Sequence, residues 1–532
     1  MKIINHSLVL MLLMAVFLLS SCSKEPKSAK LIPADATVVM RFDVKQIAKK
    51  SGINDDGKLK AELKKELKSA NLPTALHSKV EAIIDDPSKS GIDLRDPLFV
   101  YVQSYPTPAG GLVGSIGDAK AFQELINDFS KEMGVEQLQE EEGVRYLING
   151  DADFVFNDDC FAMLWRDTLA GDSKARLAEL KKLMKDGVEK SMSGNDFFKQ
   201  MCEKKGVAQM LVSYGSLMAM PQMAMMTTMM PEGLKMDEIA YLIDFEVEKG
   251  ESKAIMEILS SSSEWDKQLK KNEEIAREIK GDLLKYMSKD GFALFFNYDG
   301  AKLYEYLKSM PFVKQIPQET MTMLQKALTS IDGDGALGIS DIDEAADKID
   351  LSFLIQTKDA TLVDMCKAFG VVSPEAKETS PGCYAIPLGW DADGKQSLNL
   401  GYKNKISFVT LGMPGQNFAA ASHPFTLQDV KGRRCYLRFD FKLLNKIAQK
   451  GNTSDKIAMR EVAKMFDYVE GYDEGARKFV VRLVNKDKTK NVFELLYACI
   501  NSFANVIQSN TGDVDSYDVP LVEADTTTVD KI

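Results

Sequence analysis

A short unit recurs along the sequence, in which an alternating apolar strand runs directly into a helix. Residues 38–45 (VVMRFDVK) and 435–442 (CYLRFDFK) share the tripeptide Arg-Phe-Asp, and helical spacing follows both. A carboxylate at the start of a helix accepts hydrogen bonds from the unpaired amides of the first turn. We therefore expect Asp43 and Asp440 to be helix caps, which explains their positions without any chemistry.

Two further copies of the unit lie between these. Residues 291–303 (GFALFFNYDGAKL) form a third copy with Asn297 at the capping position, and residues 207–217 (VAQMLVSYGSL) form a looser fourth. The copies lie much further apart than the roughly 20 to 50 residues of a solenoid repeat. Duplication of whole modules is therefore the better interpretation.

Extended apolar segments follow these units, and charged helices lie between them. The expected strands are 97–103, 240–249, 348–357 and 478–485, of which the second and fourth turn back in KAIMEIL (253–259) and FELLYACI (493–500). The expected helices are 55–70, 173–186 and 265–287. Strand pairs capped by helices predict an α+β fold of duplicated strand-helix modules, in which helices cover antiparallel sheets.

The composition along the chain suggests its division into domains. The expected parts are a signal peptide (1–21), a tether (22–30), a first α+β module (31–190), a second module with a Met-rich segment and a long helix (191–289), a third α+β module (290–424), a fourth (425–510) and an acidic tail (511–532). The tail has few large apolar residues, so we expect it to be disordered.

The N-terminus has the pattern of an export signal. Lys2 precedes an unbroken apolar run at 8–19, and a helix of that length falls well short of a hydrocarbon core about 30 Å thick. The run ends in LSSC, which resembles the lipobox of bacterial lipoproteins and places Cys22 last. That resemblance implies cleavage before Cys22 and its acylation, for example with palmitate, since two or three acyl chains anchor a protein stably. The alternative is an ordinary signal peptide with an incidental cysteine.

The rest of the chain contains no second apolar run of the roughly 18 residues that a membrane helix needs. We therefore expect an envelope protein held at the membrane by its lipid anchor. Ser23 after Cys22 favours the outer membrane, and the direction in which the protein faces stays open. The chain has 67 basic and 78 acidic residues, which argues against a nucleic-acid partner.

Three features define a broader resemblance. They are the lipobox, the opening LIPADA (31–36) that leads into an apolar strand ending in Asp43, and the SYGSL element at 213–217. Together they resemble a family of Bacteroidota lipoproteins that is defined only by a domain of unknown function. The similarity extends over nearly the whole mature chain, and the family brings no catalytic residues with it.

Residues and sequence motifs that commonly take part in catalysis are scarce in this chain. Without the signal, only His77 and His423 remain as histidines, too few for a multi-histidine zinc centre. No GxSxG, HExxH or Walker A pattern occurs. We assign no catalytic residue, no metal site and no cofactor. A hydrolase whose site is assembled only by folding stays open as an alternative.

Other patterns have simpler structural interpretations. Residues 333–338 (GDGALG) match the GxGxxG pattern of dinucleotide-binding proteins. That pattern requires a strand before it and a helix after it, whereas here the sequence predicts a helix before and a strand after. We therefore expect a helix-to-strand turn. The pair Asp332 and Asp334 does not complete a calcium loop, so we expect it to lie in a solvated turn. The six cysteines besides Cys22 lie mostly in apolar runs, and we expect buried thiols more than disulfides.

Methionines are concentrated between Met218 and Met236. Flexible thioethers suit adaptable contacts with lipids or peptides, they fill irregular cores, and they can also bind Cu(I). The candidate apolar contact surface consists of Met220, Met223, Met226, Met229 and Met230.

Two tripeptides, at 167–169 and 525–527, resemble the O-glycosylation sites of the same bacterial group, so Thr168 and Thr526 are candidate glycosylation sites. The primary expectation is a membrane-anchored envelope lipoprotein with a non-catalytic binding or scaffolding role. Its partner would be an envelope protein or a lipid. An apolar-ligand or lipid-handling protein that uses the Met-rich segment is the alternative.

Overall fold

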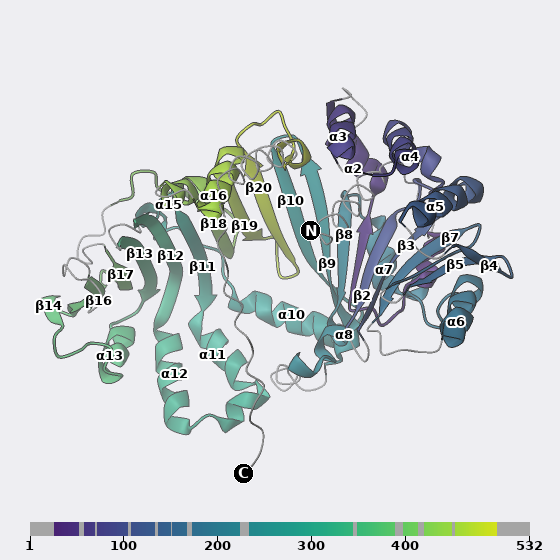
Figure 1. The fold of residues 1–532 in the computed structure, drawn as a ribbon. Helices are drawn as coiled ribbons and strands as arrows, with labels where there is room; N and C mark the ends of the chain where they lie inside the picture. Colours follow the sequence, from purple (N-terminus) through teal and green to yellow (C-terminus); the bar gives the residue numbers. More distant parts are fainter. Residues whose placement is uncertain are drawn as a thin grey trace, which may run out of the picture.

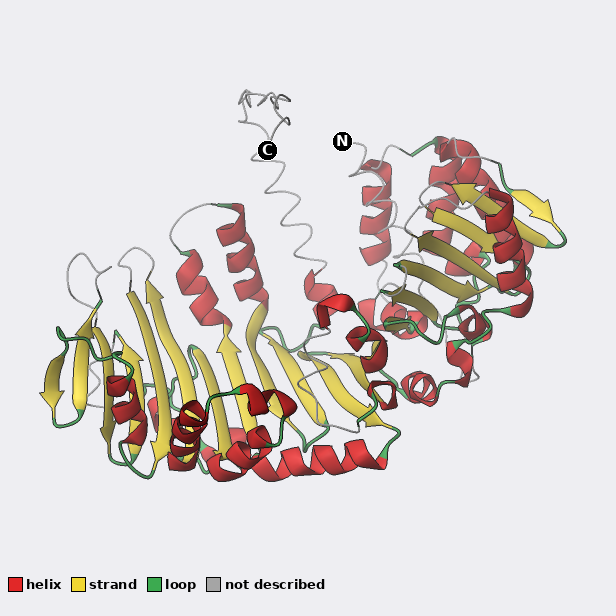
Figure 2. Ribbon diagram, turned by 90° about the horizontal axis from the view of Figure 1, so that it is seen from below, coloured by secondary structure: helices red, strands yellow, loops and turns green. Residues whose placement is uncertain are grey.

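A computed structural model describes most of the chain (Figure 1). The described residues are 26–52, 58–69, 72–104, 108–133, 137–149, 152–166, 173–223, 234–343, 348–388, 397–412, 420–449 and 453–496. Within these ranges, twenty strands form one antiparallel sheet. Figure 2 shows the strands as one continuous curved array with helices on both sides. The expected α+β class is confirmed.

One half of the sheet is built from the first ten strands. They are β1 (Val38–Phe42), β2 (Leu98–Gln103), β3 (Ala109–Ser115), β4 (Gln139–Glu141), β5 (Val144–Asn149), β6 (Ala152–Phe156), β7 (Cys160–Arg166), β8 (Ala208–Ser213), β9 (Ile239–Glu248) and β10 (Glu251–Ser260). From the outer edge to the middle, their order is β4-β5-β6-β7-β3-β2-β1-β8-β9-β10.

The other half is built from the remaining described strands. They are β11 (Phe292–Asp299), β12 (Ile331–Asp343), β13 (Lys348–Thr357), β14 (Lys377–Ser380), β15 (Cys383–Pro387), β16 (Ser397–Lys403), β17 (Ile406–Leu411), β18 (Cys435–Asp440), β19 (Phe466–Asp473) and β20 (Lys478–Asn485). From the outer edge to the middle, their order is β14-β15-β16-β17-β13-β12-β11-β18-β19-β20, which is the order of the first half. The halves meet where β10 pairs with β20.

The helices connect and cover these strands. In the first half they are η1 (Lys27–Leu31), α2 (Val44–Ser51), α3 (Lys58–Ser69), α4 (Thr74–Asp85), η2 (Pro87–Ser90), α5 (Ala119–Met133), α6 (Ser173–Asp186), η3 (Met192–Gly194), α7 (Asp196–Glu203), α8 (Tyr214–Met218), η4 (Pro221–Met223) and η5 (Met236–Glu238). In the second they are α10 (Ser263–Ile275), η6 (Leu284–Tyr286), α11 (Gly300–Lys308), η7 (Pro311–Gln315), α12 (Gln318–Ser330), α13 (Thr361–Ala368), α14 (Leu427–Val430), α15 (Phe441–Ala448) and α16 (Ser454–Met465).

The recurring sequence unit forms β1-α2, β8-α8, β11-α11 and β18-α15. Asp43 and Asp440 cap α2 and α15 by accepting backbone N–H groups at 3.0 and 2.9 Å. The capping position expected for the third copy is wrong, because β11 continues for two more residues and Asp299 caps α11. Asn297 is instead fully buried in β11. Strands of all four expected modules share the one sheet, and β11 pairs directly with β18.

Two expected elements differ from the structure. The helix expected at 265–287 ends at Ile275, because the chain directly after it pairs with the sheet. Ala276 forms a bridge with Tyr298, and the N–H of Arg277 donates to the carbonyl of Asn297 at 2.8 Å. Further on, Asp334 accepts the N–H groups of Lys280 and Gly281 at 2.9 and 2.7 Å. These bonds hold the chain against the sheet and prevent a helical turn there. The described part of the FELLYACI segment does not form a strand, since residues 492–496 are helical.

The GDGALG segment and its aspartates also differ from the expectation. They lie inside β12, not in a solvated turn or a helix-to-strand turn. Gly335 lies so close to the ring of Phe296 on β11 that a Cβ atom would collide with it. Asp334 is 1% exposed. The glycines therefore serve close packing within the sheet.

Candidate functional site

The four strands around the junction of the two halves carry apolar side chains on one face. We call this surface the central apolar face, and it consists of Met210, Ile243, Phe245, Met256, Phe479 and Val481. Register places these residues on one face, because Met210 lies opposite Ile243, Ile243 opposite Met256, and Met256 opposite Phe479. Phe245 and Val481 both lie opposite Ala254.

Apolar residues extend this face into both halves. From Ala208, next to Phe245, the row passes through Phe42 on β1 to Leu98 on β2. From Val481 it passes through Gly471, Leu437, Leu294, Leu337 and Phe353 to Val409 on β17. The row contains no polar side chain from β2 to β17. The alternation of apolar and polar side chains along each strand thus produces a continuous apolar surface only after the strands have paired.

The side chains of the central apolar face are incompletely covered by the described residues. Val481 is 38% exposed, and Met210, Ile243, Phe245, Met256 and Phe479 are all partly exposed. By contrast, Leu242 on the other face of β9 is fully buried. Large contiguous exposed apolar surfaces in soluble domains mark sites of interaction.

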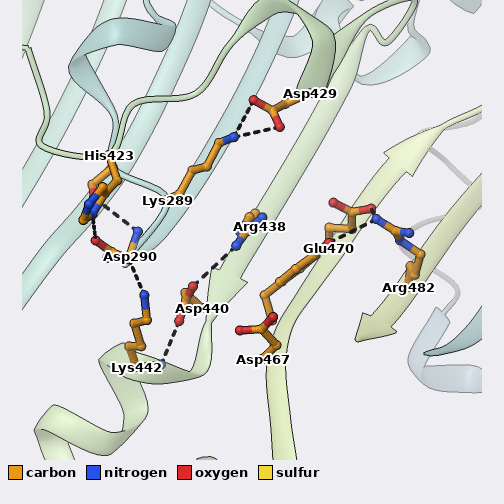
Figure 3. Close-up of polar contacts among 12 residues, drawn as sticks. Lys289, Asp290, His423, Asp429, Arg438, Asp440, Lys442, Asp467, Glu470 and Arg482 are labelled. Atoms are coloured by element: carbon orange, nitrogen blue, oxygen red, sulfur yellow. Dashed lines mark hydrogen bonds and ion pairs between the residues drawn. The ribbon is translucent and has the colours of Figure 1, made fainter. Parts of the chain in front are cut away.

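The opposite face of the same strands carries charges. Lys253 lies opposite Glu246 and Arg482, and Glu470 lies opposite Arg482 and Arg438. Arg482 donates to Glu470 at 2.7 Å and to Glu251 at 3.1 Å. Figure 3 shows Arg482 and Glu470 facing one another from neighbouring strands. Ion pairs therefore line this face at β10, β19 and β20, whereas on β9 the same face also carries Leu242, which packs into the buried core of the first half.

Charged partners also change the pKa values on this polar face. The hydrogen bond from Lys253 lowers the pKa of the Glu251 carboxyl, and Arg482 acts in the same direction against the effect of burial. Lys253 and Glu251 are 2.8 Å apart. At neutral pH these groups are therefore ionised and paired.

Helices border the central apolar face at one end of its strands. α2 packs Val44 and Ala48 into a cluster with Leu98, which lies opposite Phe42 on the apolar side. On the other half, the ring of Phe441 in α15 meets that of Phe439 on β18 edge to face, with centroids 5.6 Å apart. In Figure 1, α2 and α3 lie on one side of the central strands, and α15 and α16 on the other.

At the other end, the face adjoins the described part of the Met-rich segment. Tyr241 and Ile258, which lie opposite each other on the apolar side, pack against a buried cluster that includes Met218 and Trp265. Met223 also packs against this cluster, and Met220 is partly exposed. Met226, Met229 and Met230 lie outside the described residues.

The remaining histidines do not build a nucleophilic centre in the described residues. The His423 side chain is 68% exposed and contacts Asp290, which also accepts from Lys442 at 2.8 Å (Figure 3). The Lys442 bond and His423 keep the pKa of Asp290 below its ordinary value. His77 is also partly exposed, on α4. Among the described residues, no group of three or more metal-ligating side chains comes together.

The described cysteines behave as packing residues. Cys160, Cys202, Cys366, Cys383 and Cys435 form no disulfide within the described ranges. Burial raises the pKa of the Cys160 thiol to about 11, so this thiol is a poor nucleophile at neutral pH.

Two surface cavities lie in the first half, away from the central apolar face. One, of about 500 Å³, lies beside α6 and is lined by charged groups that include Glu142, Lys181, Lys185 and Asp186. The other, of about 570 Å³, lies between 33–35 and 188–190. No histidine or cysteine lines either cavity.

The residues expected to carry the lipid and the glycans are not among those that the structure describes. Cys22, Thr168 and Thr526 lie outside the described residues. Among the helices that are described, none has both the length and the apolar character needed to cross a membrane.

Comparisons with known proteins concern the family and the fold. A solved structure of TP0453 in crystal form I matches 44% of this chain and 80% of its own, at 13% identity and a TM-score of 0.25. Crystal form III matches 45% and 82%, at 14% identity and a TM-score of 0.27. Likenesses this weak support no argument about this chain. No curated protein matches it. Residues 29–370 match the model of the family described as "Domain of unknown function (DUF4836)", and the chain therefore belongs to that family.

Proposed function

We propose that this protein is a lipid-anchored envelope lipoprotein with a non-catalytic binding role, and that its central apolar face binds the acyl chains of lipids. The observation that carries the proposal is the row of apolar side chains that crosses the central strands and stays partly exposed. Acyl chains complement such a surface, since they bury apolar area without requiring polar partners.

The position of the Met-rich segment supports this function. Met223 packs against the same buried cluster as Tyr241 and Ile258, at the end of the same face. The described methionines of the expected contact surface therefore lie at the end of this face, and flexible methionine side chains can follow ligands of different shapes.

The anchor is the second part of the proposal. Acylation of Cys22 would hold the sheet beside a membrane, with the outer membrane as the proposed location. Cells that express the wild type should incorporate radiolabelled palmitate into the protein, and Cys22→Ala should abolish that labelling. Equal labelling of the variant would overturn the anchor without affecting the proposed ligand.

The binding role is tested with a photoactivatable palmitic-acid analogue and the purified full chain. Val481→Asp places a charge on the apolar face and should reduce labelling of β10 and β20 roughly tenfold, equivalent to about 1.4 kcal/mol. Lys478→Asp, on the opposite face of the same strand, is the matched control and should label like the wild type. Equal labelling of all three proteins would refute acyl-chain binding at this face.

A further inference from the structure

Two polar turns meet at the end of the central apolar face that lies beside α2. The backbone N–H of Gly250, between β9 and β10, donates to the carbonyl of Lys490, after β20, at 2.9 Å. The N–H of Asn485 donates back to the carbonyl of Gly250, also at 2.9 Å. The two turns therefore form one unit at the end of β10 and β20.

This unit also contacts the helices on both sides of the face. Asn491 donates through its side-chain amide to the carbonyl of Lys50 in α2. The backbone N–H of Lys486 donates to the carbonyl of Met465, the last residue of α16, at 2.9 Å. In Figure 1, this end of β10 lies between α2 and α16. Segments far apart in the sequence thus bring together a group that we call the lysine junction, which consists of Lys49, Lys50, Lys249, Lys486, Lys488 and Lys490.

Carboxylates neutralise only half of the lysine junction. Three of its lysines form ion pairs, which are Lys50–Glu248 at 2.7 Å, Lys488–Asp467 at 3.6 Å and Lys490–Asp487 at 3.8 Å. The other three, Lys49, Lys249 and Lys486, are exposed and form no ion pair within the described ranges. The lysine junction therefore keeps a positive charge that no ion pair offsets there, in a chain whose formal net charge is −11.

The opposite end of the face, beside the methionines, has the reverse balance. Three cations there are all paired, as Lys235–Glu238 at 3.5 Å, Lys267–Glu264 at 3.9 Å and Arg477–Asp266 at 2.7 Å. The neighbouring Asp237 is exposed and adds a carboxylate. The two ends of the face therefore differ in charge, which would give a bound amphiphile one preferred direction.

We propose that the ligand of the central apolar face is a lipid whose headgroup carries a phosphate, and that the lysine junction binds this headgroup. The acyl chains then lie along β10 and β20 toward the methionines. Lysine ammonium groups bind phosphate as point charges. The three lysines without ion pairs suit a phosphate monoester, which carries a charge of about −1.5 to −2 at neutral pH.

The dimensions of the face agree with this arrangement. From Gly250 to Ile258 the chain rises about 27 Å along β10. An acyl chain in one leaflet spans about 15 Å, which is half of a hydrocarbon core about 30 Å thick. A headgroup at the lysine junction therefore leaves room for the whole acyl chain on the apolar face.

This inference rests on the proposed function, because the acyl chains must occupy the face for the headgroup to lie at its end. It adds the identity of the headgroup and the direction of the lipid. The two ideas can be separated by experiment, since the headgroup and the chains contact different side chains.

The test compares two photoactivatable lipids with identical acyl chains, phosphatidic acid and diacylglycerol, in neutral detergent micelles with the purified full chain. Phosphatidic acid should label β10 and β20 of the wild type roughly tenfold more than diacylglycerol does, and added salt should reduce this preference. The triple variant Lys49→Gln, Lys249→Gln and Lys486→Gln should lower labelling by phosphatidic acid to the level of diacylglycerol. Its labelling by diacylglycerol should equal that of the wild type.

A second triple variant is the matched control, because it removes the same charge from α5, α12 and β14. It combines Lys120→Gln, Lys326→Gln and Lys377→Gln, which replace exposed lysines, and it should keep the preference for phosphatidic acid. Val481→Asp alters the apolar face and should lower labelling by both lipids.

The outcomes separate the headgroup from the chains. Equal labelling of the face by both lipids, or an equal loss of the preference in the two triple variants, overturns the inference and leaves the proposed function intact. Glycerol 3-phosphate that displaces phosphatidic acid at equal concentration also overturns it, because a free phosphate would then suffice. Labelling of the face by neither lipid refutes the proposed function, and the placement of the headgroup with it.

Discussion

At the scale of single residues, Asp334 controls the path of a whole segment. Its carboxylate is buried and accepts the N–H groups of Lys280 and Gly281 and the side-chain amide of Asn297. Asp334→Ala would leave these donors without their acceptor, so we expect a loss of about 3 kcal/mol in the free energy of unfolding. Urea unfolding measures this loss.

A neighbouring position gives the matched control. Asp332 is exposed, so Asp332→Ala should change the free energy of unfolding by less than about 0.5 kcal/mol. Asp334→Asn keeps one oxygen acceptor and should lose less than Asp334→Ala. If Asp334→Ala were as stable as Asp332→Ala, the carboxylate would not hold the segment.

The Cys160 thiol predicts a pH dependence at alkaline pH. Burial raises its pKa from 9.0 to about 11, so the folded state holds this proton more tightly than the unfolded state. Its stabilising contribution is complete below about pH 9 and is lost as the pH rises through about 11, amounting to ~2–3 kcal/mol. The difference in unfolding free energy between the wild type and Cys160→Ala should shrink over that range. A constant difference would contradict this.

At the scale of helices and strands, most of the regular pattern could be predicted from the sequence. The strands expected at 348–357 and 478–485 form β13 and β20 with those bounds, and the helix expected at 173–186 forms α6. Alternation and helical spacing are local, so they survive folding. The end of α10 could not be predicted, because the β11 residues that pair with the chain directly after it, Asn297 and Tyr298, lie more than twenty positions further along the chain.

The central apolar face was missed for the same reason. In β9, the alternation of Tyr241, Ile243 and Phe245 with Asp244 and Glu246 is visible in the sequence and indicates a two-sided strand. It does not reveal that β10 and β20 lie next to each other, since their pairing joins residues more than two hundred positions apart. Only that pairing brings the apolar side chains of the separate strands together into the central apolar face.

The cap of α11 supplies a prediction for an element. Asp299 accepts the N–H of Lys302 at 3.1 Å, so Asp299→Ala should cost about 1 kcal/mol and speed exchange of the Lys302 amide roughly fivefold. Asp299→Asn, which still caps, should restore most of the protection. Hydrogen exchange followed by mass spectrometry resolves the peptide, and unchanged exchange in Asp299→Ala would argue against this cap.

At the scale of the whole molecule, the two halves are coupled across β10 and β20. Arg482 on β20 bonds to Glu251 on β10, so a double-mutant cycle with Arg482→Met and Glu251→Gln should give a coupling energy of about 1 kcal/mol at neutral pH. The folded pKa of Glu251 is depressed below 4.5, so this stabilisation is present above that value and is lost as the pH falls through the folded pKa. A coupling that persists at pH 2 would contradict the ionic origin.

The matching strand order of the two halves also determines which strands form the two edges of the sheet. Because the halves join through their last strands, the outermost positions fall to β4 and β14, which have three and four residues. Both are polar and largely exposed, and β4 carries two adjacent glutamates. Edge strands that are short and charged are poor partners for pairing with a strand of another chain. Copies of the protein that meet at these edges are therefore hindered from joining strand to strand into a fibre.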